Sequence, residues 1–208
     1  METINVRKTK WIITAMLLLS GIFVKAQPVM TVGPKAGVNF SKLTGVTDAS
    51  WEPGLTAGFF MMYSEWEYFG ISTDLLYSKK GSRYFVRPNE GSSSIQRVSL
   101  DYIEAPVLAN FFLLGQESNI RPKIMVGPSF AYLIKAGQSG HNTTTIYTSD
   151  IGAVAGLGFN ANIAEHTWFN FDARYTHGLF DIAGRNTNSD VKNQNISVTL
   201  GIGFGFGE

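Results

Sequence analysis

Beyond residue 26, apolar residues recur at every second position in one window of the sequence after another. The most regular window is 196–206, where Ile, Val, Leu, Ile, Phe and Phe alternate with Ser, Thr and three Gly. A period of two puts successive side chains on opposite faces of a β-strand. The same pattern recurs, less cleanly in some places, at 32–41, 55–63, 69–79, 98–114, 120–134, 150–163 and 169–176. The alternation therefore predicts eight strands with two chemically different faces.

The segments between these windows differ systematically in length. Three are short (64–67, 115–118 and 164–167), and four are long and polar (42–53, 80–97, 136–149 and 178–194). Long and short segments alternate strictly, so an antiparallel meander would place all short turns at one end. Transmembrane β-barrels of the bacterial outer membrane have short periplasmic turns and long extracellular loops. The pattern predicts an eight-stranded, antiparallel, up-and-down transmembrane barrel with both termini on the periplasmic side.

The first 26 residues have the features of an export signal. Arg7, Lys8 and Lys10 precede an apolar run from Trp11 to Val24, and Ala26 provides a small residue before a cleavage point. Such a run spans about 21 Å as a helix, which is short of the roughly 30 Å hydrocarbon core. We therefore predict a cleaved secretory signal at 1–26 and a barrel domain at 27–208, with an uncleaved membrane helix as the alternative.

The polar faces of the strands indicate which side of the sheet is enclosed. A small soluble barrel has an apolar interior and a charged exterior, whereas here the apolar face is bulky and almost free of charge. The polar face carries many glycines and a balanced set of charges. We predict that these charges form a paired cluster in the lumen: Lys35, Asp74, Glu104, Arg121, Lys123, Asp172 and Arg174. An eight-stranded lumen is just filled by side chains, so this set predicts a plug rather than a charged pore.

The apolar faces would form the outer surface of the barrel. Aromatic residues gather near the ends of these faces: Tyr63, Trp66, Tyr68, Phe69, Tyr77, Tyr132, Trp168 and Tyr175. Membrane barrels have aromatic girdles at both water interfaces. A soluble sandwich or lipocalin also alternates, but the export signal and the order of loop lengths favour the membrane barrel.

Four segments resemble the PorT-like outer-membrane β-barrel family. They are KAGVNFS at 35–41, DLLYSKKG at 74–81, DYIEAPV at 101–107 and VGPSFAY at 126–132. The resemblance covers most of the chain after residue 26. It implies an eight-stranded barrel in the outer membrane of a Gram-negative bacterium, and it implies no shared activity.

The last strand window also resembles a known targeting signal. Thr199, Gly201, Phe204 and Phe206 match the C-terminal signal by which the barrel-assembly machinery recognises its clients. Many such signals end on the aromatic residue, whereas two residues follow Phe206 here. The match implies that this machinery is a partner during insertion.

Composition and motifs argue against catalytic chemistry. The chain has no cysteine, three histidines and a formal net charge of +1, so thiolate chemistry is excluded and no broad attraction to nucleic acid is expected. His177, Asp181 and Ser189 can be drawn as a triad, but loops are rich in these residue types. No metal-binding spacing occurs. We predict no enzyme activity, catalytic residue, cofactor or metal.

The long loops are therefore the part of the chain where we expect functional residues. We expect a monomeric, non-enzymatic barrel with a structural or surface-interaction role through these loops. The alternatives are a narrow porin or transporter of small solutes, and an accessory component of a secretion or envelope-assembly complex. Segment 80–97 and its neighbour Lys79 have a basic excess that can contact lipopolysaccharide phosphates, although an ordinary solvated loop also explains it.

Overall fold

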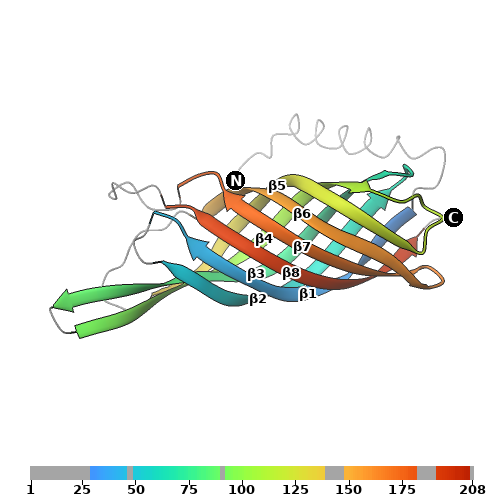
Figure 1. Cartoon of the computed structure of the whole chain (residues 1–208). Coiled ribbons are helices and arrows are strands. Elements are labelled where there is room, and N and C mark those ends of the chain that lie inside the picture. The colour runs from blue at the N-terminus through green and yellow to red at the C-terminus, as the bar shows by residue number, and fades with distance from the viewer. Residues whose placement is uncertain (1–28, 46–48, 90–91, 139–147, 182–190, 207–208) are drawn as a thin grey trace, which may run out of the picture.

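The chain folds into one closed barrel of eight antiparallel strands (Figure 1). The computed structural model describes residues 29–45, 49–89, 92–138, 148–181 and 191–206. Each strand pairs with its sequence neighbours, and β8 pairs with β1 to close the sheet. The strands are β1 (Val29–Leu43), β2 (Ser50–Ser64), β3 (Phe69–Asn89), β4 (Ser92–Phe112), β5 (Ile120–Gln138), β6 (Ser149–Ala164), β7 (Thr167–Gly178) and β8 (Asn193–Phe206). The predicted eight-stranded up-and-down fold is confirmed.

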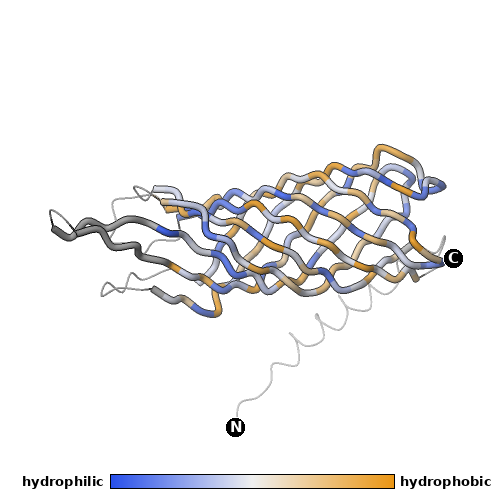
Figure 2. Tube along the Cα trace, turned by 60° about the horizontal axis from the view of Figure 1, so that its bottom comes forward, coloured by the Kyte–Doolittle hydropathy of each residue, from blue (hydrophilic) through white to orange (hydrophobic). Residues whose placement is uncertain are grey.

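The side chains alternate between the lumen and the outer surface as the sequence pattern predicts. In β1, Asn39 and Ser41 are completely buried, whereas the alternate residues Val38 and Phe40 are exposed. The outward positions of the other strands are likewise exposed Leu, Ile, Val, Phe and Tyr side chains. Figure 2 shows hydrophobic and hydrophilic residues following one another along the strands. Over the described part of the chain, no helix has the length and hydropathy needed to cross a membrane.

The two ends of the barrel differ in their connections. At one end, here called the turn end, three short connections join β2 to β3, β4 to β5 and β6 to β7, and the first and last strands begin and end there. The opposite end, here called the loop end, carries the other four connections. The three short turns therefore share one end as predicted, but one predicted long loop, 80–97, is largely strand, so the connection between β3 and β4 at the loop end is also short.

The prediction of a long loop at 80–97 is wrong. Strand β3 continues to Asn89 and β4 begins at Ser92, so most of the segment is a hairpin. β2 pairs with β3 only as far as Arg83, and β5 pairs with β4 only as far as Val98. Residues 84–89 and 92–97 therefore pair only with each other, and we call them the β3–β4 ribbon. Figure 1 shows the ribbon extending past the rim of the barrel.

The lumen also contains apolar layers that the alternation does not predict. Val154, which breaks the pattern of its window, is buried and packs with Leu108 and Met125 inside the barrel. A second apolar cluster lies on the lumen side toward the loop end and consists of Leu43, Val98, Leu100, Tyr102, Ala131 and Val191. The rule that inward residues are polar therefore fails in these two layers.

Candidate functional site

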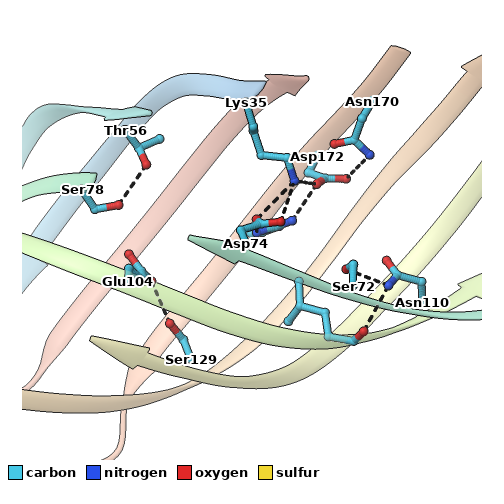
Figure 3. A network of polar contacts seen from close by, with 12 residues as sticks. Lys35, Thr56, Ser72, Asp74, Ser78, Glu104, Asn110, Ser129, Asn170 and Asp172 are labelled. Carbon is cyan, nitrogen blue, oxygen red and sulfur yellow. Dashed lines mark hydrogen bonds and ion pairs between the residues drawn. The ribbon is translucent and has the colours of Figure 1, made fainter. Parts of the chain in front are cut away.

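A network of five charged side chains crosses the middle of the lumen. The strands β1, β3, β5 and β7 contribute Lys35, Asp74, Lys123, Asp172 and Arg174, and we call these five residues the lumen plug (Figure 3 shows three of them labelled). Lys35 Nζ lies 3.2 Å from Asp74 Oδ1 and 2.8 Å from Asp172 Oδ2. The Arg174 guanidinium bridges the same two carboxylates, at 2.5 Å from Asp74 and 2.7 Å from Asp172. Lys123 Nζ completes the network at 2.9 Å from Asp172 Oδ1.

The plug is sealed from solvent on all sides. Each of its five side chains has at most 5% of its surface exposed. Three cations share two carboxylates, so every charge has a partner and the cluster keeps one net positive charge. Buried charges are tolerated only when they are paired and hydrogen-bonded in this way. The geometry blocks the centre of the lumen with salt bridges.

A second ion pair lies toward the loop end of the plug. Lys80 Nζ is 3.1 Å from Glu104 Oε2, and Ser129 donates a hydrogen bond to Glu104 over 2.9 Å. Glu104 belongs to the predicted lumen set, whereas Lys80 was predicted in a loop, and this placement is wrong. The residues Asp74, Leu76, Ser78 and Lys80 all face inward with period two, so continuing the alternation past the predicted strand end would have found Lys80.

Arg121 is buried in the lumen at the turn end, apart from the plug. Its guanidinium donates to the Glu67 carbonyl over 2.7 Å and lies 3.8 Å from the centre of the Phe112 ring. The seven predicted lumen charges are thus all buried. The structure brings five of them together, pairs Glu104 with Lys80, and gives Arg121 a carbonyl and an aromatic ring as partners.

Little space remains between the plug and the Lys80–Glu104 pair. A cavity of about 20 Å³ lies there, lined by Arg174, Glu104 and hydroxyl or amide side chains that include Thr199 and Asn195. This volume holds about one water molecule. The described side chains therefore leave no open channel for a hydrated solute through this layer of the barrel.

The structure describes two of the three candidate catalytic residues, His177 and Asp181. His177 Nδ1 lies 3.4 Å from the Tyr175 hydroxyl and 3.5 Å from Gln194 Nε2, while Ser189 and His141 are outside the described residues. Asp181 accepts a hydrogen bond from the backbone N–H of Val191. Within the described ranges, no group of three or more His, Asp or Glu is placed to hold a metal ion.

The outer surface carries aromatic residues at both ends of the barrel. At the turn end, Tyr63, Trp66, Phe69 and Phe111 form a continuous row of ring contacts with centroids 5.4–6.4 Å apart. Trp66 and Tyr68 are exposed there, Trp168 is half-buried, and toward the loop end Tyr77, Tyr132 and Tyr175 are exposed. The predicted aromatic residues therefore line the outside of the barrel near its ends.

The residues of the predicted assembly signal occupy both faces of β8. Thr199 and Gly201 are buried in the lumen, whereas Phe204 and Phe206 are exposed on the outer surface near the turn end. Their recognition by the assembly machinery stays a prediction. The predicted signal segment, 1–26, lies outside the described residues.

Similarity to known proteins agrees with this architecture. The sequence model of the family described as outer membrane protein beta-barrel domain matches residues 26–184. None of the curated proteins matches the sequence. Among solved structures, the chain is similar to the outer membrane protein OprG from Pseudomonas aeruginosa, with 14% identity, a TM-score of 0.58, and coverage of 88% of this chain and 97% of OprG. It is also similar to the outer membrane protein AlkL in lipid bilayers, with 14% identity, a TM-score of 0.50, and coverage of 85% and 90%.

At these identities the solved structures show the fold alone, and the family match covers most of the chain. The closed eight-stranded barrel, its apolar outer face and its aromatic rows are what a membrane-spanning barrel requires. The chain belongs to the outer membrane protein beta-barrel domain family and is a protein of the outer membrane.

Proposed function

We propose that this protein is a closed, non-conducting barrel that anchors an interaction surface at its loop end. The observation that carries the proposal is the lumen plug. Its five side chains form ion pairs with one another across the barrel, and a passing ion would have to break these buried salt bridges. We also propose membership of the PorT-like family, on the four segments that resemble it; that family implies no single shared activity.

The loop end faces the cell exterior in this proposal, and both termini lie in the periplasm. Barrels of this class place their short turns on the periplasmic side. The three short connections, the start of β1 and the end of β8 share one end of the structure. The longer connections and the β3–β4 ribbon would then stand on the outer surface of the cell.

The β3–β4 ribbon is the part of the loop end best suited to contact a partner. Its two strands pair with each other but with no third strand among the described residues, so the backbone groups along both outer edges are available. An unpaired strand edge is a template for an extended segment of another protein. Fewer basic side chains of segment 80–97 are free to contact lipopolysaccharide than its sequence predicts. Lys80 is buried in the lumen, and Arg83 is paired with Glu52.

Recordings in planar lipid bilayers test whether the lumen is closed. We expect the purified barrel to show no reproducible conductance steps, and we expect steps in a double variant that removes plug side chains, Lys35→Ala with Arg174→Ala. Regular large steps in the unmodified protein would refute the closed lumen and favour the narrow-porin alternative.

Shortening the ribbon tests the interaction role separately. Tyr84 and Gln96 face each other in register, so an Asn-Gly turn can replace residues 85–95 and close the hairpin at that pair. The variant should keep the heat-modifiable mobility in SDS that marks a folded barrel. Proteins that co-purify in stoichiometric amounts after gentle detergent extraction should be lost. Retention of the same partners would contradict the role assigned to the ribbon.

A further inference from the structure

The pairing of β2 with β3 is irregular near the loop end. Trp51 pairs with Ser82 and Thr56 pairs with Ser78, so four residues of β2 stand opposite three residues of β3. One of these four is Pro53, which has no N–H to donate to a neighbouring strand. β2 keeps its register with β1 across the same residues, so the irregularity affects only the β3 side. This is a β-bulge in the barrel wall.

The bulge coincides with a cavity of about 400 Å³, which we call the wall cleft. Its lining includes the outward-facing Val38 and Leu55, the inward-facing Val98, and Lys79. Leu55 is 66% exposed and lies opposite Val38 in the sheet. Val98 belongs to the apolar cluster in the lumen near the loop end. The wall cleft therefore runs from the lipid-facing surface toward apolar side chains, and its volume is within the usual range of about 300–1,000 Å³ for ligand sites.

The charges around the wall cleft are uneven. Lys80 is paired with Glu104, and Glu52 is paired with Arg83. Lys79 is exposed and has no ion pair among the described residues. Its register partner on β4 is Asp101, and no ion pair joins the two side chains. Lys79 is therefore the lining cation that remains available to an incoming anion.

Lys79 also lies at the level along the barrel where lipid headgroups are expected. It occupies the next outward position after Tyr77, which is part of the aromatic row toward the loop end. Aromatic side chains of membrane proteins gather at the headgroup level, and lysine side chains reach toward the same interface. Val38 and Leu55 are exposed apolar side chains on the outer surface of β1 and β2.

We propose that the wall cleft binds a single anionic membrane lipid, with a hydrocarbon chain against Val38, Leu55 and Val98 and the phosphate on Lys79. The lipid is the expected occupant because the rim of the cleft is apolar and faces the bilayer. This site is independent of the closed lumen, since a plugged barrel can hold a lipid in its wall. Conductance in the bilayer recordings would thus refute the closed lumen without bearing on the lipid site. Absence of bound lipid would refute the lipid site without bearing on the closed lumen.

Native mass spectrometry of the full barrel tests the site. The protein is released from nanodiscs that contain equal amounts of phosphatidylglycerol and phosphatidylcholine. We expect one phosphatidylglycerol to stay bound, and we expect Leu55→Trp, which fills the cleft, to lose it. The matched control is Leu157→Trp on β6, because Leu157 is 63% exposed on the outer surface and does not line the cleft. Equal lipid retention by both tryptophan variants would overturn the proposal.

A charge variant tests the headgroup contact without filling the cleft. Lys79→Gln should lower the preference for phosphatidylglycerol over phosphatidylcholine about threefold, as expected for one interfacial ion pair, and Lys135→Gln should leave it unchanged. Inorganic phosphate at millimolar concentration should not displace the bound lipid; displacement would mean a site for free phosphate and would refute a lipid occupant. If the Leu55→Trp protein does not insert into membranes, Val38→Phe is used instead, because it narrows the cleft from β1. Unchanged lipid retention in the Val38→Phe protein would also overturn the proposal.

Discussion

The most direct test of the lumen plug is the substitution Asp172→Asn. Asp172 is completely buried and is the shared acceptor of the network, contacting Lys35 at 2.8 Å, Lys123 at 2.9 Å and Arg174 at 2.7 Å. Asparagine has nearly the same shape and keeps one oxygen acceptor. The substitution therefore removes the charge of the carboxylate with little change in packing.

The structure sets the size of the expected effect. The plug has three cations and two carboxylates, so its net charge rises from +1 to +2 when Asp172 is neutralised. Removing one partner of a buried ion pair costs about 3–5 kcal/mol. Because the amide oxygen still accepts one hydrogen bond, we expect a loss near the lower limit, about 3 kcal/mol in the free energy of unfolding.

Urea unfolding of the barrel in lipid vesicles measures this loss as a lower midpoint with an unchanged slope. Asp101→Asn is the control, because Asp101 lies on the outer side of β4 and should change stability by less than about 1 kcal/mol. Adding Lys123→Met to Asp172→Asn returns the net charge to +1 and should recover at least about 1 kcal/mol. An Asp172→Asn barrel as stable as the unmodified one, or no recovery in the double variant, would refute the electrostatic account of the plug.

Three further predictions concern the barrel wall and the turn end. Gly33→Ala would place a methyl group 1.8 Å from a carbonyl oxygen of β8, so the free energy of unfolding in urea should fall by about 1–3 kcal/mol; Gly137→Ala, whose nearest neighbour is 3.9 Å away, is the control. Arg121→Gln loses the aromatic contact and the hydrogen bond at the turn end, and the same assay should show a loss of about 1–2 kcal/mol. Phe206→Ala should reduce the amount of barrel in outer-membrane fractions severalfold, whereas Ile196→Ala, an outward substitution on the same strand, should not.

Each of these predictions has a clear contrary result. Equal losses for the two glycine variants would show that close approach between the first and last strands is unimportant. An unchanged Arg121→Gln barrel would show that the buried guanidinium contributes nothing to stability. If the Phe206→Ala protein reaches the outer membrane in normal amounts, the final aromatic residue has no role in assembly.

The sequence was sufficient for the fold because alternation encodes the two environments of a membrane barrel. One face of each strand meets lipid and the other meets a filled lumen, so regular windows such as 196–206 predict both the strand and its orientation. The charges Lys35, Asp74, Lys123, Asp172 and Arg174 follow from the same rule. Their pairing could not be predicted, because it depends on how four non-adjacent strands face one another across the lumen.

The failures have physical causes as well. Residues 84–89 and 92–97 form a ribbon whose two strands pair only with each other, and the sequence there lacks the regular alternation of the other strands. The apolar pairs Leu100 with Tyr102 and Leu108 with Val154 fill lumen layers, where the interior resembles an ordinary protein core. The wall cleft left no pattern in the sequence beyond Pro53 and Gly54, since a bulge is one extra residue whose effect depends on the neighbouring strand.

The pairing of β1 with β8 has a consequence for biogenesis. Met30 faces Phe206 and Leu43 faces Asn193, so the seam joins the two extremes of the described chain. Until β8 has been synthesised and delivered, β1 has no second neighbour and the sheet has two open edges, which lipid cannot solvate and which invite aggregation. A chain that lacks β8 cannot form this seam, so closure of the barrel depends on the last strand to be synthesised.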